Sequence, residues 1–143
     1  MDTLLGATLA KLLLAGFTTL VEEVVLELEH RGHPGVTATH EFALQAIDGG
    51  AQSASALGRS LGVSKQAAAK TIAALEDMHY LDRRNDPEDA RRKQLTVTGH
   101  GHEMMTIGAE AFDVLRTRLA ERVGAHELES LERVLAVLTS RQG

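Results

Sequence analysis

The 143-residue sequence has no cysteine and no tryptophan, and its aromatic residues are three phenylalanines and one tyrosine. Without a thiol the chain can form neither disulfides nor thiolate metal sites, and it cannot sense peroxide through a cysteine. So few aromatic side chains also disfavour a binding pocket lined by aromatic rings. The lack of disulfides agrees with a reducing compartment, and we expect a cytoplasmic protein.

Long uncharged apolar runs are missing too. Residues 4–28 are largely apolar, but Lys11 and three later glutamates interrupt them, so no uncharged span of about 18 residues remains to cross a membrane. A secretory signal begins with basic residues, whereas Asp2 is acidic. We therefore expect an unprocessed soluble protein with no membrane partner.

The residue patterns of enzyme chemistry are likewise absent. The sequence holds no glycine-rich phosphate loop, no nucleophile with a neighbouring base and no pair of carboxylates at a defined spacing. We expect neither an enzyme nor a bound cofactor.

Apolar residues at spacings of three and four predict a long first helix over residues 3–31. The first half of this helix carries leucines on more than one face. A small monomer can hardly bury such a helix on all sides, so we expect a partner subunit to cover it.

Capping residues and glycines divide the remaining chain into shorter elements. Helices are expected over residues 37–47, 53–61, 64–79, 98–123 and 126–139. Two strands, over residues 80–84 and 93–97, flank a polar turn, and Leu95 and Val97 alternate as one face of a strand requires. This order predicts a mainly α fold in one domain, residues 1–143. Its parts are a winged helix-turn-helix lobe of about 36–98 and dimerisation helices of about 3–31 and 99–140.

The helices at 53–61 and 64–79 have the arrangement of a helix-turn-helix. Gly62 ends the first of them at a position suited to a left-handed residue. The apolar positions predicted to meet across the turn are Leu57, Leu61, Val63, Ala68, Ile72 and Leu75. The cap and outward positions of the second helix are Ser64, Lys65, Gln66, Ala69 and Lys70. Donors and small side chains at the start of a helix are what reading the major groove of DNA requires.

The net charge of −5 conceals an uneven distribution. Residues 53–93 hold eight basic side chains against six acidic ones, whereas the rest of the chain holds seven against fourteen. DNA responds to the local potential, so the basic segment favours phosphate binding. The strand–turn–strand segment forms a basic wing after the helix. Its candidate DNA-binding residues are Arg83, Arg84, Asp89, Arg91, Arg92 and Lys93.

Residues 53–101 resemble the MarR (multiple antibiotic resistance regulator) family of winged helix-turn-helix transcriptional regulators. The matching pieces are Leu-Gly-x-x-Leu-Gly-Val-Ser at 57–64, Tyr-Leu-x-Arg at 80–83, Asp-Ala-Arg-Arg at 89–92 and Leu-Thr-Val-Thr-x-x-Gly at 95–101. The flanking helices match in order and approximate length. Gly58 and Ala68 depart from the residues usual in the family.

The resemblance implies a homodimeric repressor that binds a pseudo-palindromic operator in double-stranded DNA. It would place Arg91 in the minor groove and the outward face of the recognition helix toward the major groove. Asp89 would orient Arg91 or pair with a basic residue of that helix. A winged helix that only binds protein or dimerises remains the alternative function.

Many members of this family also bind a small-molecule effector between the dimerisation helices and the DNA-binding lobe. By position, such a pocket would draw on Phe17, Val21, His40, Leu44, Met104 and Met105. Apolar residues at helical spacing usually form core instead, so the presence of an effector stays open.

Seven histidines raise the question of a metal site. The resemblance leaves a zinc-responsive regulator as a further alternative. Its ligands would come from His30, His33, His40, Glu41, His100, His102 and Glu103. Their spacing forms no motif, since His100 and His102 point to different faces of a helix. We expect surface and capping histidines and no metal.

Overall fold

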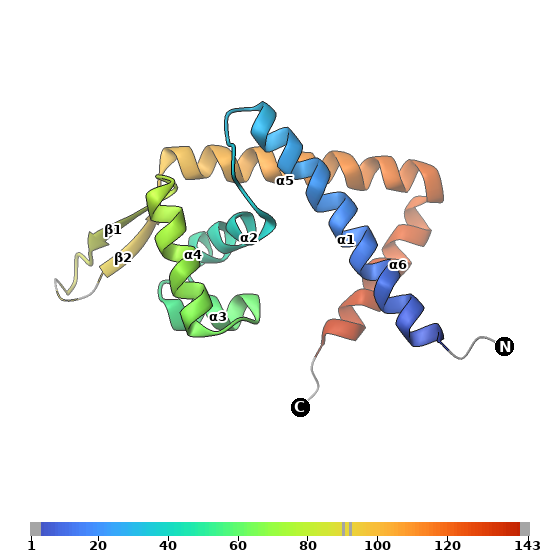
Figure 1. The fold of residues 1–143 in the computed structure, drawn as a ribbon, viewed down its shortest axis with the longest axis horizontal. Helices are drawn as coiled ribbons and strands as arrows, with labels where there is room; N and C mark the ends of the chain where they lie inside the picture. Colours follow the sequence, from blue (N-terminus) through green and yellow to red (C-terminus); the bar gives the residue numbers. More distant parts are fainter. Residues whose placement is uncertain (1–3, 90, 92, 141–143) are drawn as a thin grey trace.

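The computed structural model describes residues 4–89, 91 and 93–140. Within them, six helices and a two-stranded antiparallel sheet follow one another in the predicted order (Figure 1). The helices are α1 (Leu5–His30), α2 (Ala38–Asp48), α3 (Ala54–Leu61), α4 (Lys65–Asp77), α5 (Gly99–Val123) and α6 (Ala125–Thr139), and the strands are β1 (Leu81–Asn85) and β2 (Lys93–Val97). The predicted mainly α fold with one hairpin is confirmed.

Four helices begin at a serine or threonine, as the sequence predicted. The side-chain oxygens of Thr37, Ser53, Ser64 and Thr98 each accept a hydrogen bond from a backbone N–H of the first turn, at 3.0–3.3 Å. Gly62 ends α3 with a φ of 72°, the left-handed conformation that glycine adopts without strain. These local signals fix where the elements of the lobe begin and end.

The core lies where α2, α3, α4 and the hairpin meet the second half of α1 and the first half of α5. Leu28, Leu44 and Met104 are among its fully buried side chains. Leu95 and Val97 of β2 are also buried, as their alternation predicted. The wing is therefore attached to the core by one face of β2 and by the buried Leu81 at the start of β1.

The helix-turn-helix packs largely as predicted. Ala68, Ile72 and Leu75 of α4 are buried, and Ala68 is fully enclosed despite its small side chain. The prediction for Val63 was wrong, because its side chain is 43% exposed. Val63 follows Gly62, whose left-handed conformation turns the chain and directs the valine side chain away from the two helices.

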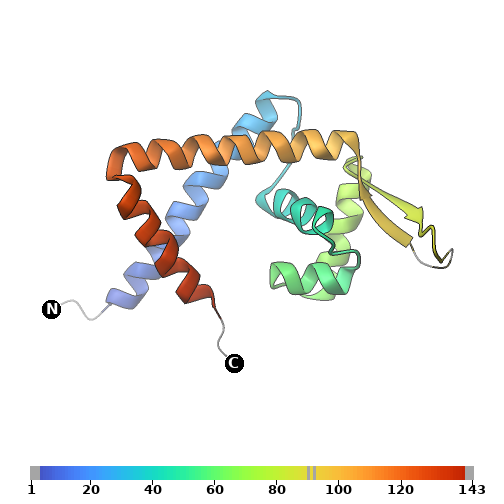
Figure 2. The same cartoon turned by 180° about the vertical axis from the view of Figure 1, so that it is seen from behind.

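α5 runs along one side of the molecule (Figures 1 and 2). The winged-helix lobe, made of α2, α3, α4 and the hairpin, lies below the N-terminal end of α5. Helix α6 and the N-terminal half of α1 lie toward its other end, together with both chain termini. No helix in the described ranges is long and apolar enough to cross a membrane.

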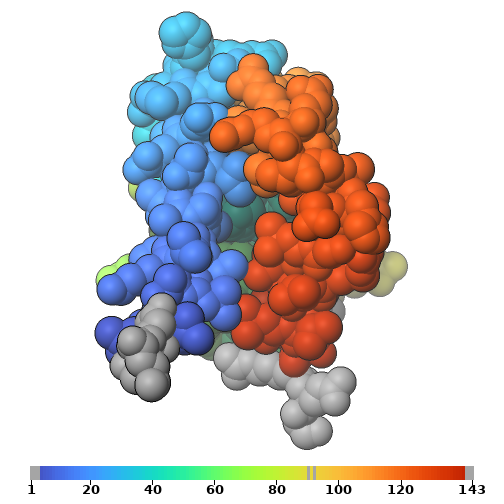
Figure 3. All heavy atoms as spheres, turned by 90° about the vertical axis from the view of Figure 1, so that its right-hand side faces the viewer, coloured from blue at the N-terminus to red at the C-terminus, as the bar shows by residue number. Residues whose placement is uncertain are grey.

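The terminal helices expose apolar side chains over much of their length. The exposed side chains include Leu5, Leu9, Leu12 and Leu14 of α1 and Val134, Val137 and Leu138 of α6, each between 56% and 75% exposed. Figure 3 shows the two helices, in blue and red, on either side of a hollow. Large apolar surfaces of this kind usually mark an interaction site.

Candidate nucleic-acid interface

The outward face of α4 carries the residues that the sequence singled out. With Ala68, Ile72 and Leu75 turned into the core, the remaining face of the first two turns is exposed. On this face lie Lys65, Gln66, Ala69 and Lys70. No ion pair within the described part of the chain engages either lysine. The N-terminal half of α4 therefore presents two unneutralised cations between small side chains.

The wing is a hairpin of two five-residue strands, in which Leu81 pairs with Val97 and Asn85 with Lys93. At its open end, the Lys93 ammonium donates a hydrogen bond to the Asn85 side-chain oxygen at 2.7 Å. Arg84 lies 3.7 Å from the Asp82 carboxylate on the same strand. Both basic side chains are exposed.

Two aspartates shape the turn between the strands. Asp86 accepts a hydrogen bond from the backbone N–H of Glu88 at 2.9 Å, and Asp89 accepts one from the N–H of Arg91 at 3.0 Å. Such local bonds fix a turn without secondary structure. Asp89 thus orders the backbone at Arg91, whose side chain is exposed. Arg92, also predicted to bind DNA, lies outside the described residues.

Two contacts that the sequence did not predict fix the wing to the rest of the lobe. The Arg83 guanidinium donates to the Glu76 carboxylate at the end of α4, with Nε and Oε1 2.9 Å apart. On the other strand, the backbone N–H of Leu95 donates to the Gln52 side-chain oxygen at 2.7 Å. Gln52 comes from the α2–α3 loop. Arg83, a predicted DNA-binding residue, lies in this contact between wing and helix.

The end of α4 is tied directly to the start of α5. The backbone N–H of Tyr80 donates to the carbonyl of Leu75 at 2.9 Å, and His79 adopts a left-handed φ of 65°. This pattern is a Schellman helix end. Thr98 then donates its N–H to the Tyr80 carbonyl at 3.0 Å and its hydroxyl to the His79 carbonyl at 2.7 Å.

The expectation that histidines lie on the surface or at caps was wrong for His33. His40 does complete a cap, since its ring accepts a hydrogen bond from the Thr37 N–H at 3.1 Å. The side chain of His33, however, is 1% exposed. Its Nδ1 is 2.9 Å from the Tyr80 hydroxyl and its Nε2 is 3.1 Å from the Glu103 carboxylate.

The ring of His100 stacks on both His33 and Tyr80, with centroids 4.6 Å apart in each case. Burial, with a smaller contribution from the Glu103 carboxylate, raises the pKa of the Tyr80 hydroxyl. These four side chains form what we term the Tyr80 cluster: His33, Tyr80, His100 and Glu103. It joins the α1–α2 loop, the link between α4 and β1, and the first two turns of α5.

The six predicted effector residues are placed unevenly. Leu44 and Met104 are fully buried, whereas Phe17 is 48% exposed. Val21, His40 and Met105 are partly buried. Phe17 lies 6.3 Å from Phe42, and Phe42 lies 6.2 Å from Phe112, measured between ring centroids. All three phenylalanines of the chain thus gather between α1, α2 and α5, although the effector role stays a prediction.

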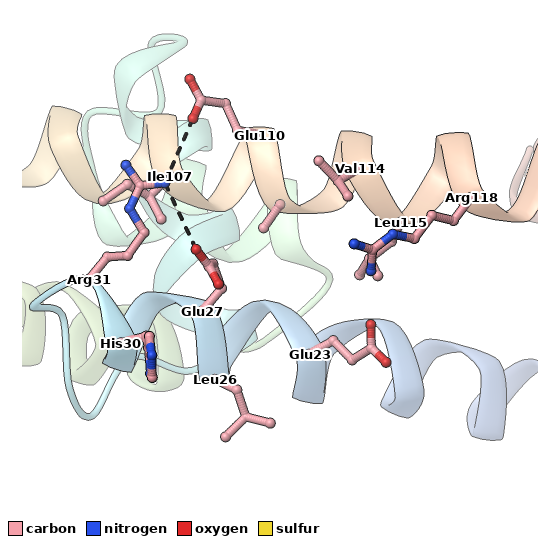
Figure 4. A pocket seen from close by; sticks show the side chains of 11 residues that line it. Glu23, Leu26, Glu27, His30, Arg31, Ile107, Glu110, Val114, Leu115 and Arg118 are labelled. Atoms are coloured by element: carbon pink, nitrogen blue, oxygen red, sulfur yellow. Dashed lines mark ion pairs between the residues drawn. The ribbon is translucent and has the colours of Figure 1, made fainter.

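A groove of about 640 Å³ lies elsewhere, between α1 and α5 (Figure 4). Arg31 crosses it, 4.0 Å from both the Glu27 and Glu110 carboxylates. None of the six predicted effector residues lines this groove.

The burial of one carboxyl group, that of Glu41, was not predicted from the sequence. The Glu41 side chain is 1% exposed, and its Oε2 has no hydrogen-bond partner among the described residues. Its Oε1 accepts a hydrogen bond from Gln45 at 2.7 Å. Burial raises the pKa of Glu41, and the bond from Gln45 opposes that rise.

Comparison with known proteins places this lobe in a family. Residues 35–92, which cover α2 to the tip of the wing, match the sequence profile of the MarR family. The winged-helix lobe is thus similar to the MarR family. MarR-family proteins are transcription regulators and not enzymes. No curated protein matches the chain.

Solved structures of MarR-family proteins share the fold of this chain over nearly its whole length. The transcriptional repressor CouR, bound to a 23-mer DNA duplex, has a TM-score of 0.77 and 18% identity, with 96% of each chain covered. Apo MarR from E. coli has a TM-score of 0.67 and 19% identity, covering 92% of this chain and 97% of its own. A MarR family protein of Mycobacterium tuberculosis in complex with p-aminosalicylic acid has a TM-score of 0.65 and 23% identity, covering 92% and 98%.

Proposed function

We propose that this protein is a transcription regulator of the MarR family, which binds a pseudo-palindromic operator in double-stranded DNA as a homodimer and represses transcription there. The observation that carries the proposal is the pairing of two surfaces on one lobe. The outward face of α4 carries lysines separated by small side chains, and the exposed Arg91 lies at the tip of the adjoining wing. A helix of this kind suits the major groove, and an arginine suits the narrow minor groove.

The contacts divide the candidate residues into two roles. Lys65, Gln66, Ala69 and Lys70 are proposed to face base edges and nearby phosphates, with Ser64 and the first-turn N–H groups meeting a phosphate. Arg83, Arg84 and Lys93 have partners within the lobe, so we assign them to holding the wing and to phosphate contact. Asp89 is proposed to act through the backbone at Arg91.

A second copy of the chain is the proposed cover for the apolar faces of α1 and α6. Burying these leucines and valines provides the main driving force for association. Two-fold symmetry would then present two recognition helices to successive major-groove faces, about 10–10.5 base pairs apart. The fold shared with CouR, which was solved on a DNA duplex, supports this arrangement.

Relief of repression by a small molecule is the remaining part of the proposal. The gathered phenylalanines 17, 42 and 112 lie between the proposed dimer helices and the lobe. They offer flat apolar surface to an aromatic ligand. A relative with the same fold was solved with p-aminosalicylic acid, which supports an aromatic carboxylate as the first class to test.

DNA selection tests the function directly. Full-length protein is used to enrich bound duplexes from a pool of random DNA sequences. The affinity for the most enriched duplex is then measured by fluorescence anisotropy at fixed salt. We expect an inverted repeat, and Arg91→Ala should weaken binding by about 1–3 kcal/mol, roughly 5- to 150-fold. Arg122→Ala, at the exposed far end of α5, is the matched control and should bind as the wild type does.

Three results would contradict the proposal. If no duplex is enriched, the winged helix serves protein contact instead of DNA. If Arg91→Ala binds as tightly as Arg122→Ala, the wing tip does not enter the groove. Light scattering on the same samples must show a dimer for the inverted-repeat model to hold.

A further inference from the structure

Three members of the Tyr80 cluster bring metal-ligating atoms together. One ligand atom from each of His33, His100 and Glu103 lies within 4.8 Å of the other two. We propose that these three residues bind a divalent transition-metal ion of the zinc type. The site does not depend on DNA binding, although the regulatory consequence given below rests on the proposed function.

The separation of the two best-placed ligands fits a shared ion. His33 Nε2 and Glu103 Oε1 are 3.1 Å apart. Two ligands held at about 2.0–2.1 Å by a tetrahedral zinc ion lie roughly 3.3 Å from each other. These atoms thus need to move by only a few tenths of an ångström. The His100 side chain is exposed, and its ring would have to leave its stacked position on His33 and Tyr80 to turn toward the same point.

The surroundings of His33 are those of a metal-binding imidazole. A ligating histidine usually holds its second ring nitrogen in a hydrogen bond, which fixes the ring and its tautomer. Here the Tyr80 hydroxyl lies 2.9 Å from Nδ1. With the proton on Nδ1, the Nε2 lone pair points toward Glu103 and is available to the ion. Burial holds the His33 ring in place as the rigid member of the set.

A proton on Nε2 would also explain the contact with Glu103. In that arrangement His33 donates to Glu103 and accepts from the Tyr80 hydroxyl. The metal ion would replace that proton. The two arrangements differ in what Glu103→Gln does, because the amide oxygen of glutamine still accepts the hydrogen bond but is a far poorer ligand than a carboxylate.

The ligand set and its exposure select the kind of ion. Two imidazoles and one carboxylate, without thiolate, suit Zn²⁺, whereas Mg²⁺ and Ca²⁺ prefer oxygen ligands alone. His100 and Glu103 are three residues apart on α5, so their side chains share one helix face. The Glu103 side chain is 60% exposed, which lets the ion enter and leaves a further position for water.

The position of the site gives it a regulatory consequence. His33 belongs to the α1–α2 loop, and the other two ligands belong to the first turns of α5. The ion would hold both against Tyr80, which connects α4 to β1. Bound metal would therefore restrict how the recognition helix can turn relative to α5, and so change the affinity for DNA.

Zinc titration of the tag-free full-length protein tests the site without DNA. Competition with a chromophoric chelator should give one Zn²⁺ per chain, and Zn²⁺ should raise the thermal unfolding temperature. Glu103→Gln and His100→Gln should each weaken Zn²⁺ binding by at least tenfold. Both residues are exposed, so the variants are expected to fold. His102→Gln is the matched control, because His102 is an exposed neighbour outside the ligand set.

The outcomes separate clearly. Absence of Zn²⁺ binding, or unchanged binding by Glu103→Gln, overturns the site, and an equal loss in His102→Gln means adventitious binding to surface histidines. Adding Zn²⁺ to the anisotropy assay tests the consequence: the wild type should change its DNA affinity, and His100→Gln should not. If the protein binds zinc but no DNA, the proposed function fails and the metal site stands.

Discussion

Replacing Gly101 with alanine should destabilise the protein, because α5 approaches the end of α4 too closely at this position to admit a side chain. A Cβ at this position would lie 2.5 Å from the Tyr80 carbonyl oxygen and 2.7 Å from Cγ1 of Val97. The valine side chain can rotate, but the carbonyl oxygen accepts the Thr98 N–H at 3.0 Å and cannot retreat without losing that bond. Overpacking costs about 1–3 kcal/mol, and the strained hydrogen bond costs about 1 kcal/mol more.

Alanine in place of glycine stabilises a helix by up to about 1 kcal/mol, and at Gly101, in the first turn of α5, this gain offsets part of the cost. The expected net loss for Gly101→Ala is therefore about 1–3 kcal/mol of unfolding free energy. Urea denaturation followed by circular dichroism measures it, at one protein concentration for all variants because a dimer is expected.

Gly99→Ala is the matched control for Gly101→Ala. Gly99 lies two residues earlier on the same helix, and a Cβ there would meet nothing within 4 Å. Its variant gains the same helix propensity without the clash, so it should be as stable as the wild type or more stable by up to about 1 kcal/mol. If Gly101→Ala proves as stable as Gly99→Ala, the close approach of α5 to Tyr80 is not a constraint in solution, and the coupling argued from it fails.

Two further variants test the recognition helix and the buried carboxyl. Lys70→Ala should lower the slope of log affinity against log salt by roughly one counterion, and an identical slope would remove Lys70 from the phosphate contacts. Burial raises the pKa of Glu41, so the folded chain holds this proton more tightly than the unfolded chain, and stability falls as pH rises from the ordinary glutamate pKa to the raised one. Glu41→Gln should show a smaller fall in that window by urea denaturation, and a pH dependence equal to that of the wild type would mean that Glu41 is solvated in solution.

The parts of the fold that could be predicted from sequence are those specified by neighbouring residues. Ser64 caps α4 because its oxygen meets an N–H three residues away. Leu95 and Val97 share a face because a strand alternates. In the same way, the apolar spacing of α4 predicts its buried residues, and the residues on the opposite side of the helix are then expected to be exposed. Val63 broke the pattern because the turn at Gly62, and not helical spacing, directs its side chain.

The contacts that position the candidate site join distant parts of the chain and leave no local signal. His33 and Tyr80 are 47 residues apart, and Gln52 and Leu95 are 43 apart. A histidine after a helix end and a glutamine in a loop are each typical surface residues. The bonds of His33 follow from how the start of α5 lies against the α1–α2 loop, and the bond of Gln52 follows from how β2 packs against α2. No periodicity in the sequence encodes either arrangement.

This placement makes Tyr80 the residue through which the terminal helices can influence the recognition helix. Its carbonyl and that of His79 accept bonds from Thr98 at the start of α5, and its hydroxyl meets His33 from the α1–α2 loop. Rotating α5 must either carry the end of α4 along or break these bonds at a net cost of about 1 kcal/mol each. In a two-fold dimer, a change in the angle between the two α5 helices would then change the spacing between the two recognition helices. Binding energy at the dimer helices or at the Tyr80 cluster can thus alter DNA affinity without contact to DNA.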